Sequence, residues 1–294
     1  MRVQVQIVNA FIDGESGGNA AGVVLDAEQF NQQQKLAIAA KVGLSETAFV
    51  SPSQSADFKL EFFTPNRQIA HCGHATVATF SYLQQIGRIG KARTSKETID
   101  GNREIHIEGD MAFMEQRAPV YRALREQVNA IDAASILSSL RLSGSDLLEN
   151  VAPMVVNTGG AFLIIPLKNE AAVRGADPQF ELIESISEKL ELIGYYLFST
   201  DTKVAGRDAG TRMFAPRYGI TEESATGMAA GPLACFMYDR LNIKKEFLTI
   251  EQGHLMTPAS PSVIDVKLSV VDGVIQKLMA GGRAKATRTL TIEL

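Results

Sequence analysis

The chain has 294 residues, of which 45% are hydrophobic and 21% are charged. These proportions are typical of a folded globular protein and exclude collagen-like, disordered and low-complexity chains. The formal net charge is −4 and no basic run is long enough to follow a phosphate backbone, so we expect no nucleic-acid partner. The uncharged apolar-rich stretch from Ala225 to Tyr238 contains two glycines and a proline and is shorter than the roughly 18 residues of a spanning helix, so we expect no membrane segment either.

Two features predict a cytoplasmic location. The first eight residues alternate apolar with polar, as a strand does, and lack the apolar centre of a signal peptide. The two cysteines, Cys72 and Cys235, cannot build a disulfide framework and fit a reducing compartment.

The length predicts two domains, and hydrophobic periodicity predicts their elements. In the first half we expect strands at Met1 to Val8, Ala21 to Leu25, Thr47 to Ser51 and Phe58 to Phe63, helices at Gln29 to Val42 and Ala75 to Ile86, and a hairpin of Glu104 to Glu108 with Met111 to Gln116. The charged stretch from Ala118 to Asn150, with one helix near Ala133 to Leu142, is the expected domain boundary.

The second half predicts a similar order of elements. Strands are expected at Ala161 to Pro166, Tyr195 to Ser199, Thr211 to Phe214, Val263 to Val271 and Arg288 to Glu293, with helices at Phe180 to Leu192 and Ala225 to Arg240. Strands and helices do not strictly alternate, which argues against a doubly wound fold.

A weak internal repeat links the two halves. Phe63-Thr64-Pro65 precedes Cys72-Gly73-His74, and Phe214-Ala215-Pro216 precedes Thr226-Gly227-Met228 at a nearly equal distance. Each glycine is expected to begin a buried helix, whose unpaired N–H groups and positive dipole end bind anions. Paired helix ends at Gly73 and Gly227 would hold a substrate carboxylate between them; the alternative is that both glycines only permit tight turns.

Glu46 and His74 are the candidate acid/base residues. Glu46 lies in the apolar hexapeptide Leu44-Ser45-Glu46-Thr47-Ala48-Phe49, and burial raises a carboxylate's pKa toward the range of a usable general acid or base. The alternative is a helix cap or a surface residue. His74 follows Gly73 and would act as a hydrogen-bond donor or proton shuttle, while Glu223 could supply a second acid or cap the next helix.

Neither metal nor cofactor chemistry is expected. His71-Cys72-Gly73-His74 contains ligand residues, but without a carboxylate or a second cysteine pair it offers too few of them. No Ser-His-Asp arrangement, Walker loop, HExxH or Rossmann glycine fingerprint is present in its required context. The sequence therefore predicts cofactor-free chemistry.

Together the motifs resemble the phenazine-biosynthesis isomerase (PhzF-like) family over nearly the whole chain. The motifs that carry the resemblance are Gly18-Asn19-Ala20-Ala21-Gly22-Val23, the Glu46 hexapeptide, Phe63-Thr64-Pro65, Cys72-Gly73-His74-Ala75-Thr76 and Glu223-Ser224-Ala225-Thr226-Gly227. The resemblance implies an α+β, diaminopimelate-epimerase-like fold of two pseudo-symmetric domains, each a mostly antiparallel sheet wrapped around a central helix. The expected domains are residues 1–118 with about 281–294, and residues 119–280. The final strand would return to the first domain, and homodimers are common in the family.

The resemblance also implies roles for individual residues. By this resemblance Glu46 would shuttle the proton with help from Gly73 and His74. Our own hypothesis adds that His74 and Glu223 position the substrate and that Gly73, Gly227 and the Met228 amide bind its carboxylate, with Asn19 as a further substrate-binding residue. In this chain Glu223-Ser224 stands where the family has Asp-Pro, and Met228 stands where it has Ser. Gln68 replaces an expected Glu and Ala20 an expected Pro. A thioether cannot donate the hydrogen bond of a hydroxyl, so the phenazine precursor itself is not the expected substrate.

Two alternatives stay open beside a cofactor-independent isomerase of a small carboxylate. The related epimerases use two thiols; Cys72 supplies one, but Thr226 stands at the other position and is too weak an acid to exchange a proton. A one-thiol amino-acid dehydratase or epimerase-type enzyme using Cys72 is therefore the first alternative. A non-catalytic small-molecule binder, suggested by the changes at Met228 and Glu223, is the second.

Overall fold

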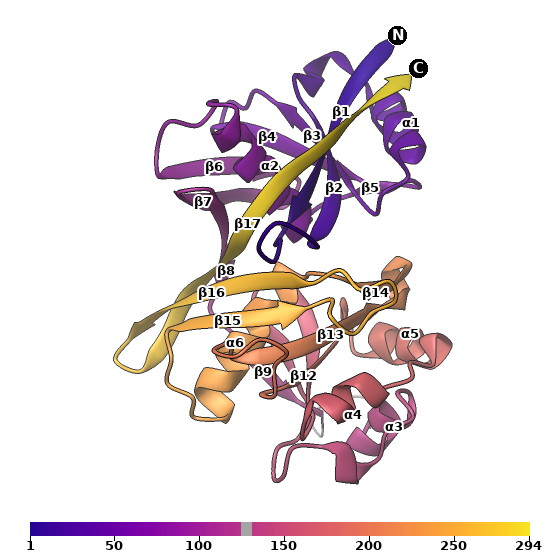
Figure 1. Ribbon diagram of the computed structural model, residues 1–294, viewed down its shortest axis with the longest axis vertical. Helices are drawn as coiled ribbons and strands as arrows, with labels where there is room; N and C mark the ends of the chain where they lie inside the picture. The colour runs from indigo at the N-terminus through magenta and orange to yellow at the C-terminus, as the bar shows by residue number, and fades with distance from the viewer. Residues whose placement is uncertain (125–130) are drawn as a thin grey trace. The chain divides into compact units, whose positions relative to one another are not determined.

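The computed structural model describes residues 1–124 and 131–294, and Figure 1 shows their path. The chain divides into two compact units: unit 1 comprises Met1–Glu115 and Gly281–Leu294, and unit 2 comprises Gln116–Ala280. Residues 125–130, which fall within the stretch expected to hold the domain boundary, lie outside the described residues. Within the described part of the chain, no helix combines the length and the hydropathy needed to cross a membrane.

Unit 1 is a mostly antiparallel sheet. β1 (Arg2–Ala10) lies between β2 (Asn19–Val24) and the C-terminal part of β17 (Val274–Glu293), antiparallel to both, so the two chain ends lie side by side (Figure 1). The sheet continues through β3 (Thr47–Ser51), β4 (Phe58–Phe63), β6 (Arg93–Thr98), β7 (Gly101–Glu108) and β8 (Met111–Arg117), with the short β5 (Gln68–Ile69) paired to β4. The pairs β2–β3 and β4–β6 are parallel.

Two helices accompany this sheet, with the short 3-10 helix η1 (Ala27–Gln29) before the first. α1 (Gln32–Val42) begins at a capping box formed by Asn31 and Gln34 and ends at Gly43 in the left-handed conformation. α2 (Gly73–Gln85) contacts β1, β2, β3 and β7 and has 10 of its 13 residues buried. Its small Gly, Ala, Ser and Thr side chains let strands approach from several sides, so it is the central helix of the unit.

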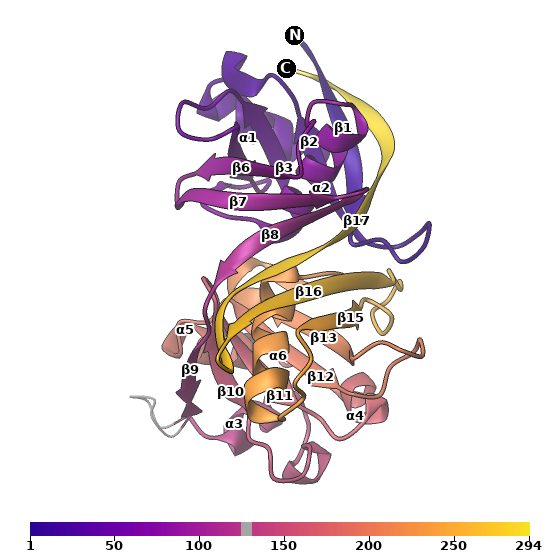
Figure 2. The same cartoon turned by 90° about the vertical axis from the view of Figure 1, so that its left-hand side faces the viewer.

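Unit 2 is built in the same way. Its strands are β9 (Val120–Ala123), β10 (Met154–Asn157), β11 (Ala161–Pro166), β12 (Gly194–Ser199), β13 (Ala209–Ala215), β14 (Ile220–Glu223), β15 (Phe247–Gln252) and β16 (Ser262–Val271). The central helix α6 (Gly227–Arg240) packs against β10, β11 and β16 (Figure 2). The other helices among the described residues of this unit are α3 (Ala133–Ser138), α4 (Glu170–Gly175) and α5 (Phe180–Lys189), with the 3-10 turns η3 (Gly144–Asp146) and η4 (Pro216–Tyr218).

The two units repeat one strand order. In unit 1 the sheet runs β2, β3, β4, β6, β7 with parallel, antiparallel, parallel and antiparallel pairs. In unit 2 it runs β11, β12, β13, β15, β16 with the same succession of orientations. α2 and α6 occupy the same place in this order, and they begin at Gly73 and Gly227, the two glycines of the repeat detected in the sequence. The two halves therefore share one architecture.

Several elements differ from the prediction: β5, β9, β10, β14 and α4 are not among the expected elements, and α1 begins at Gln32 rather than Gln29. Further differences concern β6, β17 and α6. β6 is not predicted, because its inward-facing side chains are Thr94, Lys96 and Thr98, which carry no apolar alternation. β17 is far longer than the predicted strand Arg288 to Glu293, because glycines interrupt the apolar alternation from which its first part could have been predicted. Gly281 is needed for close approach of the backbone, since a Cβ there would lie 2.3 Å from the Ala112 carbonyl oxygen. α6 begins at Gly227 rather than Ala225.

Candidate active site

Glu46 lies directly before β3, where the chain passes close to β2. The Gly22 N–H donates to the Glu46 carbonyl oxygen at 3.1 Å. A Cβ on Gly22 would lie 2.9 Å from Thr47 Oγ1, so only glycine permits this approach of the two strands. Glu46 is 5% exposed. The packing of β2 against β3 thus holds the buried Glu46 directly before the first residue of β3.

The first turn of α2 supplies the partners of Glu46. Cys72 is the N-cap residue, Gly73 is the first helical residue and His74 the second. The Thr76 hydroxyl donates to the Cys72 carbonyl oxygen at 2.6 Å, which satisfies an acceptor at the start of the helix. All four residues are buried. The turn is therefore held in place from inside the unit.

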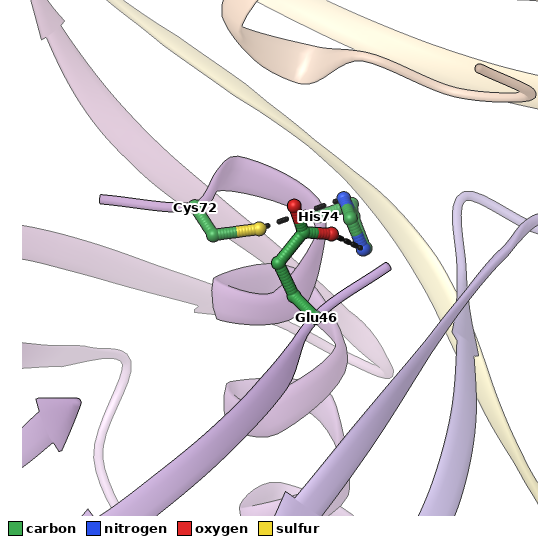
Figure 3. A group of neighbouring side chains, drawn as sticks. All are labelled: Glu46, Cys72 and His74. Atoms are coloured by element: carbon green, nitrogen blue, oxygen red, sulfur yellow. Dashed lines mark hydrogen bonds and ion pairs between the residues drawn. The ribbon is translucent and has the colours of Figure 1, made fainter. Parts of the chain in front are cut away.

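Glu46, His74 and Cys72 form one buried cluster (Figure 3). Glu46 Oε2 lies 3.3 Å from His74 Nε2, and Cys72 Sγ lies 3.6 Å from His74 Nδ1. The imidazole thus connects a carboxylate on one side to a thiol on the other. Such an arrangement can pass a proton between a substrate and the protein, because each of the three groups can hold or release one.

Burial shapes the chemistry of the thiol. It raises the pKa of Cys72, while the neighbouring His74 lowers it and Glu46 raises it further. In the absence of a bound cation the protonated thiol is favoured. The three side chains also place one potential ligand atom each within 4.8 Å of one another. Glu46 thus lies beside His71-Cys72-Gly73-His74 and supplies the carboxylate that this tetrapeptide lacks.

A buried lysine contacts the same first turn of α2. Lys96, on β6, is fully buried; its ammonium donates to the Thr76 hydroxyl at 2.6 Å and lies 3.4 Å from His71 Nδ1. It also faces the Phe62 ring. Burial lowers the pKa of Lys96 to about 7, and burial beside Lys96 keeps the pKa of His71 well below its ordinary value. Sequence reasoning missed Lys96, although the alternation of β6 places it on the inward face.

Asn19, the remaining unit 1 residue expected at the site, begins β2. It is buried and pairs with Ala10 of β1. Its backbone is therefore held by the same sheet that positions Glu46.

In unit 2 the residues expected at the site gather at the start of α6. The Thr226 hydroxyl donates to Glu223 Oε2 at 2.6 Å. Gln252 braces both residues: its amide nitrogen donates to the Glu223 carbonyl oxygen at 2.6 Å and to the Thr226 hydroxyl at 3.1 Å, and its Oε1 accepts from the Thr226 N–H at 3.1 Å. Tyr196 also donates to Gln252 Oε1. Gln252 is the second residue that sequence reasoning missed; it stands directly before Gly253, at the end of β15.

Gly227 and Met228 form the first turn of α6. The Gly227 carbonyl oxygen accepts from the Gln116 side chain at 2.8 Å. A Cβ on Gly160 would lie 3.0 Å from Met228 Cε, so the thioether lies against that glycine. The structure thus groups Glu46, His74 and Gly73 with Cys72 in unit 1, and Glu223, Gly227 and Met228 with Gln252 in unit 2.

Comparison with known proteins assigns the chain to a family. The family described as phenazine biosynthesis-like protein matches residues 8–289. This chain belongs to that family. An uncharacterised isomerase of Escherichia coli, YddE, is 28% identical over 290 residues, which cover 97% of this chain and 96% of the relative. The trans-2,3-dihydro-3-hydroxyanthranilate isomerase of Pseudomonas chlororaphis is 29% identical over 235 residues, 78% of this chain and 77% of that protein.

A solved structure confirms the fold. A phenazine biosynthesis protein of the PhzF family from Bacillus anthracis matches with a TM-score of 0.90 and 24% identity, and each chain is covered completely. The expected α+β, epimerase-like fold is therefore confirmed. Membership of the phenazine biosynthesis-like family also confirms the expectation of an isomerase-type enzyme.

Proposed function

We propose that this member of the family is a cofactor-independent isomerase that moves a proton on a small, carboxylate-bearing substrate. The observation that carries the proposal is the contact between Glu46 Oε2 and His74 Nε2, 3.3 Å apart, with both side chains buried at the first turn of α2. A buried carboxylate next to an imidazole suits general acid–base catalysis, because each group can set the protonation state of the other.

In the proposed reaction Glu46 removes a proton from one carbon and returns it to another carbon of the same conjugated system. No atom is gained or lost, and the double bonds shift between the two positions. His74 keeps the carboxylate oriented and shares its proton. General acid–base catalysis of this kind contributes typically about 10²- to 10⁴-fold to the rate.

The substrate carboxylate is proposed to bind at helix N-termini. The first N–H groups of α2 and α6, at Gly73, Gly227 and Met228, have no acceptor within their own helix and lie at the positive end of its dipole. Asn19 and Glu223 would add polar contacts, and Met228, in place of the family's Ser, would favour a substrate less polar at that point than the phenazine precursor.

The test is proton NMR in D2O with trans-2,3-dihydro-3-hydroxyanthranilate, on which the relative from Pseudomonas chlororaphis is named as acting, followed by other small carboxylates. We expect deuterium to enter one such substrate with the unmodified protein, and Glu46→Gln to lower that rate at least about 10²-fold, because the amide cannot accept the proton. The exposed Glu28→Gln serves as the matched control and should keep full activity. Turnover by Glu46→Gln at the rate of the control would contradict the role of Glu46.

A second candidate function rests on the thiol. Cys72 Sγ lies 3.6 Å from His74 Nδ1, which supports a one-thiol dehydratase or epimerase-type reaction on a hydroxylated amino acid. There the Cys72 thiol would pass its proton to His74, and the resulting thiolate would take the proton from the α-carbon. His74 would give its proton to the leaving hydroxyl, which departs as water. Loss of water from such a substrate, abolished by Cys72→Ser and retained by Cys235→Ser, would favour this function over the isomerisation.

A further inference from the structure

The cluster of Glu46, Cys72 and His74 contains the ligand types of a zinc site. Zinc is bound by thiolate, imidazole and carboxylate, and in a tetrahedral site neighbouring ligand atoms lie about 3.3 to 3.6 Å apart, given metal–ligand distances of about 2.0 to 2.3 Å. Here Cys72 Sγ lies 3.6 Å from His74 Nδ1 and Glu46 Oε2 lies 3.3 Å from His74 Nε2, so each distance is of this size but the two are measured to opposite nitrogens of the ring. Figure 3 shows the three side chains turned toward one another. One atom from each lies within 4.8 Å of the other two.

From this geometry we propose that Glu46, Cys72 and His74 bind one soft divalent cation of the Zn²⁺ type, with the fourth position left to water or to a substrate carboxylate. The contacts as they stand use opposite imidazole nitrogens, so binding moves the carboxylate or the ring until one nitrogen faces both partners. All three side chains are buried, so this adjustment requires rotation about side-chain torsions while the backbone of the turn stays in place.

Charge favours the proposed complex. One thiolate and one carboxylate neutralise a divalent cation, so the buried cluster gains a metal without gaining net charge. Cys72 is the N-cap residue of α2, where the helix dipole stabilises a thiolate. The nearest cation, Lys96, is turned to Thr76 and His71, so His71 is engaged there and is not the fourth ligand.

The ligand set also predicts selectivity. Thiolate and imidazole are soft or borderline ligands, which select Zn²⁺ and Co²⁺ over the hard Mg²⁺ and Ca²⁺. The other cysteine, Cys235, is buried in the middle of α6 and belongs to no such cluster among the described residues. It therefore offers a matched control.

The consequence for activity rests on the proposed function. A cation on Glu46 removes the base that would accept the substrate proton, so Zn²⁺ is expected to inhibit the isomerisation. The binding itself does not depend on that function, and a spectroscopic readout keeps the two apart.

The test is Co²⁺ titration of the purified, chelator-treated full chain, followed by absorption. We expect one equivalent to give a sulfur-to-cobalt charge-transfer band, Zn²⁺ to displace the Co²⁺, and excess Mg²⁺ to leave the band unchanged. Cys72→Ser should remove the band and Glu46→Gln should weaken binding by at least about tenfold, while Cys235→Ser should keep both. Circular dichroism checks that each variant is folded.

Three results would overturn the proposal: no charge-transfer band at one equivalent, a band that persists in Cys72→Ser, or a band lost in Cys235→Ser. If Co²⁺ binds as described while no carboxylate substrate is turned over by the metal-free protein, the metal site stands and the proposed isomerisation fails. If a substrate is turned over and no charge-transfer band appears, the proposed isomerisation stands and the metal site fails.

Discussion

At the scale of single residues, buried polar groups distinguish this chain. Lys35 and Lys96 are both buried lysines in unit 1, but their surroundings differ. Lys35 forms an ion pair with Glu61, whereas Lys96 contacts a hydroxyl, an imidazole and an aromatic ring. A buried ammonium with neutral partners is costly to charge, and a buried ion pair is costly to break.

Lys96→Met is expected to stabilise the protein below neutral pH. The pKa of Lys96 is about 7 in the folded protein against the ordinary 10.5, so between these values the unfolded chain binds more protons and stability rises with pH. Below pH 7 both states are charged and the full cost of burial, on the order of a few kcal/mol, opposes folding. Urea unfolding at about pH 6 and about pH 9 should show a larger gain for the variant at the lower pH.

The matched control is Lys35→Met, which leaves the partly buried Glu61 without its cation. This change should lower the free energy of unfolding by about 3–5 kcal/mol. If Lys96→Met is as destabilising as Lys35→Met at both pH values, the view of Lys96 as a costly buried charge is wrong.

At the scale of elements, close backbone approach and side-chain bracing place the candidate site residues. Gly22 lets β2 approach β3 and so sets the position of Glu46. Gln252, at the end of β15, holds Thr226 and Glu223 at the start of α6. In unit 1, β2 therefore positions Glu46 directly before β3, and in unit 2, β15 positions Thr226 and Glu223 before α6.

Gly22→Ala is expected to push β2 and β3 apart. The new Cβ would lie 2.9 Å from Thr47 Oγ1 and 3.2 Å from Val5 Cγ1, so overpacking should cost about 1–3 kcal/mol of stability. Glu46 would shift with β3, and activity should fall as well. Gly90→Ala, where a Cβ meets nothing within 4 Å, should be close to neutral in thermal unfolding. Equal melting temperatures for the two variants would refute the argument.

Gln252→Leu is expected to leave the Thr226 N–H and the Tyr196 hydroxyl without their acceptor. Because both groups are buried, the loss should cost about 1–3 kcal/mol for each group that finds no other partner. Chemical denaturation measures this cost, with the exposed Gln33→Leu as the control for the substitution itself. A variant as stable as the control would mean that Gln252 does not brace α6.

At the scale of the whole chain, one strand order is used twice, and β17 returns to close unit 1. Its last residues, Gly281–Leu294, belong to that unit. They pair with Arg2 to Val5 of β1, a part of β1 that β2 does not reach because β2 pairs with β1 only from Gln6 onward. Ile292 also packs with Val3 and Val5 in the core of unit 1. The C-terminus therefore stabilises a unit whose other residues come from the start of the chain.

Deletion of residues 281–294 is expected to destabilise unit 1 selectively. Removing the packed Leu290 and Ile292 side chains alone should cost on the order of 3–6 kcal/mol. Hydrogen exchange should then show loss of protection across Arg2 to Val5, while β12 in unit 2 keeps its protection. Deletion of Leu294 alone is the control. Unchanged protection of β1 after the longer deletion would contradict this role of β17.

The sequence by itself predicted whatever depends on local pattern. Period-two alternation located β3, β4 and β11, and helical spacing located α2, α5 and α6, because side-chain direction repeats within a few residues. The motifs at Gly73 and Gly227 indicated the repeat and the family. The apolar surroundings of Glu46 indicated a buried carboxylate, which the structure confirms.

Only the tertiary structure decided which distant residues meet. The contact of His74 with Glu46, the contact of Lys96 with Thr76 and the bracing of Thr226 by Gln252 all join separate segments of the chain. The polar residues Lys96 and Gln252 read as surface residues in a pattern of hydropathy, because burial of a polar group depends on partners that other strands supply. Local sequence determines an element's periodicity, whereas strand pairing and helix packing determine what each side chain faces.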